Sequence, residues 1–188
     1  TYNSYNGEPV TVVLAKALLA AHFNPAGAEL PLEEYKAGDK VVPYRVIAEY
    51  KGADLVGMHY AQLFPWVKPV AKEDEKFVDA SADAFRVIPG DYVTTEDGTG
   101  IVHIAPTFGA DDAFVAKAAG IPSLFMINKK GETRPMVDFT GKFWTIDELD
   151  EEFVRDCVDV ELYSKFAGAY VKNAYDPQYT VDGKYDEK

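Results

Sequence analysis

The chain has 188 residues, of which 47% are hydrophobic and 27% charged, and its formal net charge at pH 7 is −12. This length is enough for one compact domain with a real core, and the composition excludes a disordered or fibrous chain. The acidic balance argues against broad, non-specific binding to a nucleic-acid backbone, which requires clustered Lys and Arg side chains. We therefore expect no binding to DNA and only a small, local contact with any RNA.

Neither a membrane span nor a metal site is predicted. The longest apolar run, residues 10–23, contains Thr11, Lys16 and His22, so it is too short and too polar to cross a bilayer. No basic segment precedes it, as a secretory signal would require. The single cysteine, Cys157, cannot form an intramolecular disulfide, which fits a reducing, cytoplasmic compartment. The three histidines and this cysteine are too widely separated for the spacing of a metal site.

The first part of the chain is predicted to contain two strands and one helix. Residues 2–7 are turn-like, and residues 10–14 are typical of a strand in residue type. Apolar side chains at helical spacing predict a helix over residues 14–23, which Asn24-Pro25 would end. A second strand is expected over residues 46–50.

The middle of the chain is predicted to form a hairpin and a helix. The aromatic segment 63–66 is expected to be a loop that packs on the core. Residues 84–95 and 101–105 are predicted to be strands joined through residues 96–100, because Asp-Gly between β-branched runs is a strong hairpin signal. A short helix is expected over residues 111–119, closed by a glycine.

The last part completes an α+β pattern. A second hairpin is predicted from residues 123–127 and 133–137, and an acidic helix over residues 146–158, with Cys157 as buried or half-buried filler. Residues 163–171 fit either a helix or a loop and strand, and the tail, residues 180–188, is expected to be frayed. Short strands with a few helices between them predict a single domain over residues 1–188, with a β-barrel-like sheet and peripheral helices.

One segment combines a strand, a histidine and a helix start: Gly98-Thr99-Gly100-Ile101-Val102-His103-Ile104-Ala105-Pro106-Thr107-Phe108-Gly109-Ala110-Asp111-Asp112. Because side chains alternate along a strand, Val102 and Ile104 are expected on the core face, and His103 beside the small Ala105 on the other. Pro106 would end the strand pairing. The imidazole and the N-terminus of the next helix are then predicted to converge on one space.

Each polar residue of this segment has a structural and a functional interpretation. Asp111 is well placed as the N-cap of the helix, which would leave Asp112 free to reach a ligand ammonium group, although an aspartate at a helix start is usually a cap. A strand histidine is usually a satisfied or half-exposed side chain, yet His103 could hydrogen-bond a hydroxyl or orient water. His22 and His59 lack comparable surroundings and are interpreted as structural or surface residues.

The residues from Gly98 to Pro106, with Gly109 and Asp112, closely resemble the signature of the editing domain of isoleucyl-tRNA synthetases. Residues 2–7 with 12–19, and residues 51–64, resemble further segments of that domain, so the resemblance covers most of the chain. Thr107 and Phe108 depart from the usual Ala-Pro-Gly-His-Gly pattern of the family. The sister domain of the valine enzymes usually has Lys at the place of His103, which separates it from this sequence.

The resemblance implies an ester hydrolase that removes valine from mischarged valyl-tRNA(Ile). The family's aspartate at the position of Asp112 binds the α-ammonium group of the substrate, and its histidine at the position of His103 lines the site near the terminal ribose. These two are the implied catalytic residues. The implied substrate-binding residues are Gly100, Ile101, Val102, Ala105, Pro106, Thr107, Phe108 and Asp112.

The resemblance also implies partners and a larger parent protein. The partners are the 3′ CCA end of tRNA(Ile) carrying valine and the remainder of a synthetase. This segment needs no cofactor, because ATP and Mg²⁺ serve the parent's catalytic domain, which ligates isoleucine to tRNA(Ile). The family's threonine-rich strand is not found in the sequence, so the chain resembles a fragment, and its activity alone is left open. Two alternatives stay open: a non-catalytic β-barrel binding module, which the acidic charge favours, and the editing domain of a valyl- or leucyl-tRNA synthetase.

Overall fold

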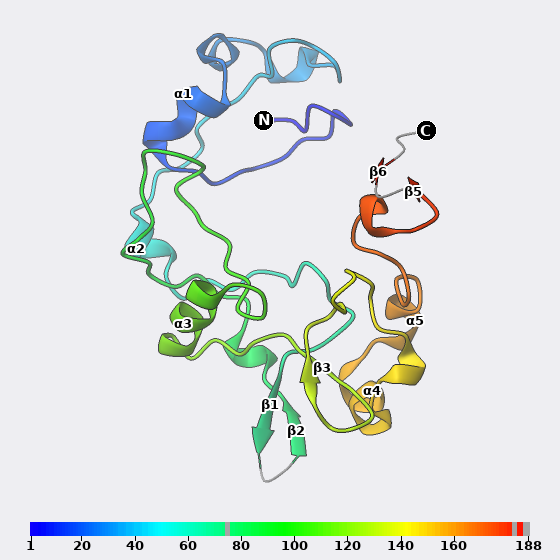
Figure 1. Ribbon diagram of the computed structural model, residues 1–188. Coiled ribbons are helices and arrows are strands. Elements are labelled where there is room, and N and C mark those ends of the chain that lie inside the picture. The colour runs from blue at the N-terminus through cyan, green and yellow to red at the C-terminus, as the bar shows by residue number, and fades with distance from the viewer. Residues whose placement is uncertain (74–75, 182–183, 186–188) are drawn as a thin grey trace. The chain divides into compact units, whose positions relative to one another are not determined.

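The computed structural model describes the chain except residues 74–75, 182–183 and 186–188, and except the side chains at 72, 181, 184 and 185 (Figure 1). The chain divides into two compact units. Unit 1 comprises Thr1–Val56 and Ile88–His103, and unit 2 comprises Gly57–Val87 and Ile104–Lys188. Whether the two form one domain, as predicted from the sequence, stays a prediction.

Unit 1 is built from short helical turns joined by extended chain. Asn24 accepts a hydrogen bond from the Ala26 N–H at 3.0 Å, and Pro25 begins the next turn, so the first helical stretch ends where the sequence predicts. The helix predicted over residues 14–23 is therefore confirmed in a slightly shorter form. The helical elements of unit 1 are η1 (Lys16–Leu18), α1 (Leu19–His22), η2 (Pro25–Ala28), η3 (Leu32–Glu34) and α2 (Gly52–Leu55).

The two strands predicted in this unit are wrong. Residues 11–15 and 42–50 belong to no helix and to no strand ladder. Their β-branched side chains consequently stay exposed, with Val46 and Ile47 having 56% and 76% of their surface open. β-branched residue types favour a strand, but a strand also needs a neighbour to pair with.

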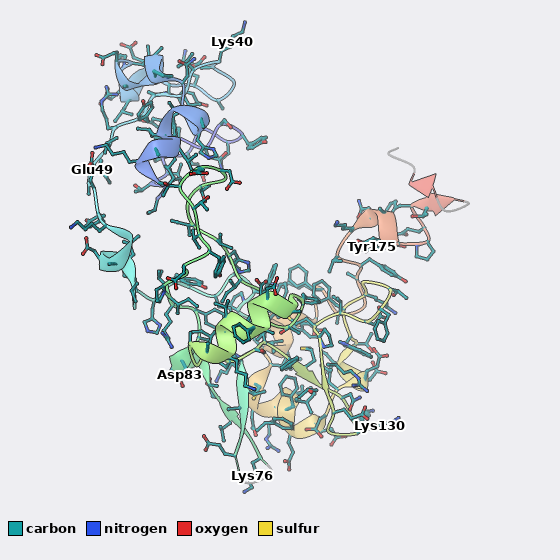
Figure 2. The ribbon with its side chains drawn as sticks, turned by 60° about the vertical axis from the view of Figure 1, so that its left-hand side comes forward. Lys40, Glu49, Lys76, Asp83, Lys130 and Tyr175 are labelled. Atoms are coloured by element: carbon teal, nitrogen blue, oxygen red, sulfur yellow. The ribbon has the colours of Figure 1, made fainter. Side chains whose placement is uncertain are left out.

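Side chains hold the second of these segments to the rest of unit 1. The Arg45 guanidinium donates hydrogen bonds to the carbonyl oxygens of Ala28 and Leu30 at 2.6 and 2.7 Å. Glu49, labelled in Figure 2, forms an exposed ion pair with Lys16 at 2.8 Å. The Arg45 contacts satisfy carbonyls at the end of η2, whereas an exposed ion pair such as the second contributes little stability.

The described residues of unit 2 form three antiparallel hairpins. In the first, Val70 lies opposite Asp79, and in the second Met126 lies opposite Arg134. The second confirms the hairpin predicted around residues 128–131, with shorter strands, while the first was not predicted. The strands are β1 (Val70–Glu73), β2 (Lys76–Asp79), β3 (Met126–Ile127), β4 (Thr133–Arg134), β5 (Thr180–Val181) and β6 (Lys184–Tyr185).

The hairpin predicted from residues 84–95 and 101–105 is wrong. The segment that was expected to pair with residues 101–105 pairs instead with residues 57–60, since the Val87 N–H donates to the Met58 carbonyl at 2.9 Å and the Tyr60 N–H donates to the Phe85 carbonyl at 2.8 Å. A local turn signal was overridden by a partner from elsewhere in the chain. The described residues thus form two-stranded sheets and no closed barrel, so the α+β class is supported and its barrel-like part is not confirmed.

Side-chain caps begin the helical stretches that follow Thr145 and Asp150. The Thr145 N–H and hydroxyl both donate to the Glu148 carboxylate at 2.8 Å, and the Asp150 side chain accepts from the Phe153 N–H at 2.9 Å. The predicted acidic helix is confirmed as two pieces on either side of Leu149. The helical elements are η4 (Ser81–Asp83), α3 (Ala110–Ala118), η5 (Ile146–Glu148), α4 (Glu151–Cys157), α5 (Val160–Tyr163) and η6 (Asn173–Tyr175).

The core of unit 2 gathers around an aromatic cluster. Trp66 is buried and stacks on Phe64 with ring centroids 5.1 Å apart, so the predicted packing of the loop 63–66 on the core is confirmed for Trp66, while Leu63 and Phe64 stay exposed. The fully buried Tyr163 donates its hydroxyl hydrogen to the Trp144 carbonyl at 2.6 Å. Cys157 is buried, as predicted. The buried cluster contains Trp66, Val67, Val70, Met126, Ile127, Met136, Leu149, Phe153, Cys157 and Tyr163.

The end of the chain lies partly outside the described residues. Of the predicted tail, residues 180–188, the structure describes only the backbone of β5 and β6 and the side chain of Thr180. In the part of the chain that is described, no helix has both the length and the apolar character needed to cross a membrane.

Candidate functional site

Two glycines shape the turn that opens the predicted site. Gly98 and Gly100, in unit 1, have φ angles of +60° and +73°, which L-residues with a Cβ rarely adopt. A Cβ at Gly100 would also lie 2.5 Å from the Cβ of Ala15, whereas a Cβ at Gly98 would meet nothing within 4 Å. Gly100 is therefore required both for the backbone conformation and for close approach to the N-terminal segment.

The apolar residues after this turn are open to solvent. Ile101 and Val102 have 50% and 52% of their surface exposed, and Ile104 is half-buried. The prediction that Val102 points into the core is therefore wrong, because residues 101–105 have no partner strand to fix two distinct faces. His103 is also exposed, and within the described residues its imidazole makes no hydrogen bond. The imidazole is thus available to a ligand.

Ala105 is the fixed point of the next turn, in unit 2. Its carbonyl oxygen accepts hydrogen bonds from the N–H groups of Phe108 and Gly109 at 2.9 and 3.0 Å. Its own N–H donates to the Oδ2 atom of Asp112 at 2.8 Å. Both backbone groups of this one residue are therefore satisfied within the turn that leads into α3, which fixes the path of the chain between them.

The remaining predicted binding residues lie on that turn. Pro106 and Thr107 are half-buried, and the Thr107 hydroxyl donates to the Leu124 carbonyl at 2.7 Å. Phe108 keeps 64% of its surface exposed. Thr107 consequently anchors the turn to the following segment of unit 2, while the Phe108 ring is the part of the turn open to a ligand.

Asp112 has a structural partner on one oxygen only. The helix predicted to begin near residue 111 begins at Ala110, and its N-cap is Gly109, so the prediction of Asp111 as N-cap is wrong. Asp112 instead reaches back from the first turn of α3 to the Ala105 N–H through Oδ2. In the described chain no hydrogen bond reaches its Oδ1. The carboxylate can therefore hold the turn and present one oxygen to a cation at the same time.

Gly109 makes room for this carboxylate. A Cβ at Gly109 would lie 2.7 Å from the Oδ2 atom of Asp112, inside the contact distance of the two atoms. Glycine at this position is therefore set by the neighbouring side chain and not by its own φ angle, which is −100°. The sequence did not signal the contact, since nothing in the spacing of the two residues separates an aspartate that reaches back from one that points out.

The predicted convergence of His103 and Asp112 stays a prediction. His103 is the last residue of its segment in unit 1, and Asp112 belongs to unit 2. Each unit therefore presents one of the two side chains that the sequence suggested would share a substrate. Sequence reasoning interpreted His22 as a structural or surface residue and did not identify its contact with the Gly98 carbonyl, because 76 residues separate the two.

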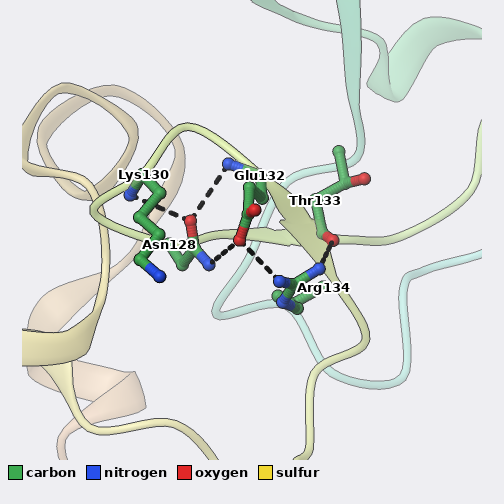
Figure 3. Close-up of polar contacts among 5 residues, drawn as sticks. All are labelled: Asn128, Lys130, Glu132, Thr133 and Arg134. Atoms are coloured by element: carbon green, nitrogen blue, oxygen red, sulfur yellow. Dashed lines mark hydrogen bonds and ion pairs between the residues drawn. The ribbon is translucent and has the colours of Figure 1, made fainter.

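A hollow in unit 2 lies apart from these residues. It has a volume of about 490 Å³ and is lined by Val70, Phe77, Phe125 and residues 131–134. Figure 3 shows the polar contacts of Glu132, one of these lining residues, which accepts a hydrogen bond from the Asn128 amide and pairs with Arg134. The Asn128 amide and the Arg134 charge lower the pKa of the Glu132 carboxyl below its usual value. The residues that could bind here already bind each other, so this hollow is a weak candidate.

The sequence is similar to known proteins over its whole length. It is 72% identical over 188 residues to an isoleucine–tRNA ligase of Bacteroides thetaiotaomicron, covering 100% of this chain and 16% of that protein. An isoleucine–tRNA ligase of Porphyromonas gingivalis is 53% identical over 178 residues, which are 94% of this chain and 15% of that protein. One of Treponema denticola is 39% identical over 145 residues, which are 76% of this chain and 12% of that protein.

These relatives are much longer than the chain, which spans 16% or less of the length of each of these three. No family model matches the sequence. No solved structure matches the fold. The chain is therefore similar, from one end to the other, to one segment of the isoleucine–tRNA ligases.

Proposed function

We propose that this chain is the editing segment of an isoleucyl-tRNA synthetase and hydrolyses the ester bond of valyl-tRNA(Ile). The observation that carries the proposal is the 72% identity to an isoleucine–tRNA ligase across the whole chain. The residues from Gly98 to Asp112 add the resemblance to an editing signature. In this proposal the parent enzyme uses ATP to ligate isoleucine to tRNA(Ile) in the cytoplasm.

Such an activity compensates for a physical limit on how well a binding pocket can select isoleucine over valine. An apolar pocket distinguishes substrates that differ by one methylene by only about 1–3 kcal/mol, and isoleucine against valine is the standard example of that limit. A second site that accepts only the smaller amino acid removes the product of the first site's errors. Hydrolysis at this second site gives free valine and tRNA with a free terminal ribose hydroxyl.

The two predicted catalytic residues suit the two polar ends of the reacting ester. The Oδ1 atom of Asp112 would accept a hydrogen bond from the α-ammonium group of the valyl moiety, while Oδ2 stays on the Ala105 N–H. The exposed imidazole of His103 would hydrogen-bond the terminal ribose or orient the attacking water. Water then adds to the ester carbonyl carbon, the bond to the ribose oxygen breaks, and that oxygen takes a proton.

The acidic charge of the chain limits what it contacts on the tRNA. With a net charge of −12, the chain would hold only the 3′ CCA end, and the remainder of the synthetase would bind the other phosphates. Binding of tRNA by this chain alone should therefore be weak and should fall further as salt is raised.

A deacylation assay tests the proposal. The longer ligase that contains this segment is mixed separately with valyl-tRNA(Ile) and isoleucyl-tRNA(Ile), and the loss of each amino acid is followed with time. We expect faster loss of valine than of isoleucine. Loss of both at the background rate would contradict the proposal and favour the non-catalytic binding module. Preferential activity on mischarged tRNA(Val) or tRNA(Leu) would assign the segment to a sister enzyme.

A further inference from the structure

The end of the first helical stretch touches the turn that opens the motif. His22 is the last residue of α1, and its Nε2 atom lies 2.5 Å from the carbonyl oxygen of Gly98. A carbonyl oxygen can only accept, so Nε2 must carry the hydrogen and the neutral imidazole must be the Nε2–H tautomer. The contact joins residues that are 76 positions apart, both within unit 1.

The next two residues of the turn are held by the same stretch. The Ala15 N–H donates to the Thr99 carbonyl at 2.8 Å. Gly100 packs so closely on Ala15 that a Cβ there would lie 2.5 Å from the Ala15 Cβ. Three consecutive residues, Gly98, Thr99 and Gly100, are therefore each fixed against residues 15–22.

The position of the turn determines where the following residues begin. The Thr99 hydroxyl donates to the Ile101 carbonyl at 3.1 Å, and His103 comes two residues later. No strand ladder supports residues 101–103, so the turn is what orders their start. We propose that His22 is a positioning residue for the motif: its Nε2–H holds the Gly98 carbonyl and thereby sets where the Ile101–His103 segment begins.

The effect on ester hydrolysis rests on the proposed function, whereas the contact itself does not. Replacing His22 by residues with amide side chains distinguishes the loss of the hydrogen bond to the Gly98 carbonyl from the loss of the imidazole ring itself. His22→Gln places an N–H donor near the position of Nε2, and His22→Asn places the same group one methylene short, near the position of Nδ1. His22→Leu removes the donor and keeps an apolar side chain. Only the Gln variant should replace the wild-type contact.

The first measurement uses the 188-residue chain and needs no substrate. Amide hydrogen exchange at Ala15, followed by NMR, reports how firmly the turn is held, and the imidazole ¹⁵N shifts of His22 report the tautomer. We expect the Nε2–H tautomer, exchange in His22→Gln within about twofold of wild type, and exchange faster by about two- to tenfold in His22→Asn and His22→Leu, the range of one net hydrogen bond. Equal exchange in all three variants would overturn the contact.

The second measurement uses the longer ligase and compares deacylation of valyl-tRNA(Ile) with isoleucine charging. We expect His22→Asn and His22→Leu to lower kcat/KM for deacylation by about two- to tenfold, His22→Gln to restore it, and charging to stay unchanged. Faster Ala15 exchange with unaltered deacylation would overturn the positioning role. If the wild-type ligase shows no selective deacylation, the proposed function fails, and the exchange data still decide whether His22 holds the turn.

Discussion

Replacing Asp112 by Ala or by Asn separates its two roles. The Oδ2 atom accepts the Ala105 N–H at 2.8 Å, so it holds the turn before α3, and Oδ1 is the oxygen proposed to bind the substrate ammonium group. Asparagine keeps an oxygen that can accept the Ala105 N–H but carries no charge. Alanine loses both the acceptor and the charge. The turn should therefore survive in one variant and not in the other, while the ammonium site is lost in both.

The size of each effect follows from the geometry. Asp112 lies in the first turn of α3, where a negative charge stabilises a helix by about 0.3–1 kcal/mol, and both variants lose this. The alanine variant also loses a hydrogen bond to a charged group, which is worth about 1.5–3 kcal/mol when buried and less at this half-buried position. We expect Asp112→Ala to be about 1 kcal/mol less stable than Asp112→Asn.

Urea unfolding followed by circular dichroism measures the free energies, and Asp111 supplies the matched control. Asp111 is exposed, lies in the same helical turn, and its side chain makes no hydrogen bond within the described part of the chain. The difference in stability between its Ala and Asn variants measures the intrinsic helix preference of the two residues. Both variants should leave deacylation of valyl-tRNA(Ile) unaltered. The same difference between Ala and Asn at residue 112 as at residue 111 would refute the turn role. Deacylation at the parent rate by Asp112→Asn would refute the ammonium role.

Three further predictions concern the glycine turn and the core. Gly100→Ala should lower the free energy of unfolding by about 1–3 kcal/mol more than Gly98→Ala, because only a Cβ at Gly100 meets Ala15. Combining Gly100→Ala with Ala15→Gly should remove most of that difference in urea denaturation. Tyr163→Phe should cost about 1 kcal/mol in the same assay, because it removes a buried hydrogen bond. Burial raises the pKa of both the Cys157 thiol and the Tyr163 hydroxyl, because the folded protein favours their neutral forms. Their contribution to the free energy of unfolding is complete below their unfolded pKa values of about 8.5 and 10, and it is lost as the pH rises above them. Urea midpoints measured from pH 7 to 11 should therefore fall.

Each of these three has an outcome that contradicts it. Equal destabilisation by the two glycine variants would contradict the close approach of Gly100 to Ala15. Unchanged stability of Tyr163→Phe would show that the hydroxyl hydrogen bond contributes nothing. The Tyr163→Phe variant is also the control for the alkaline transition, since it should keep only the part that begins near the thiol pKa. An identical pH dependence in both proteins would contradict the assignment to Tyr163.

Local signals predicted the elements whose partners are near in sequence. The helical stretch that ends before Asn24 and the hairpin β3–β4 depend on caps and turns within a few residues. The prediction of a hairpin around residues 96–100 was wrong, because the backbone of residues 85–87 hydrogen-bonds to residues 57–60 instead. A sequence pattern describes which residues tolerate extended backbone, but it does not say which distant segment will pair with them.

The candidate site shows the same division. Glycines at 98, 100 and 109 were visible in the sequence, but their reasons differ: two have left-handed backbone angles, and the third is adjacent to a carboxylate. The contact of His22 with Gly98 carried no signal, because 76 residues separate the two and no short motif joins them. Contacts across long sequence separations need coordinates, whereas residue types at a turn can be inferred without them.

A motif can be specific in sequence for structural reasons as well as chemical ones. Gly109 and Asp112 depend on each other, because the carboxylate occupies the space that a Cβ at residue 109 would need, and the same carboxylate fixes the Ala105 N–H. Such a unit would be required in any protein that uses this turn, whether or not a substrate binds there. The groups that remain available for chemistry are therefore those without a hydrogen-bond partner among the described residues, namely the Oδ1 atom of Asp112 and, in unit 1, the imidazole of His103. An editing site requires both groups to engage one substrate, whereas a structural turn requires neither.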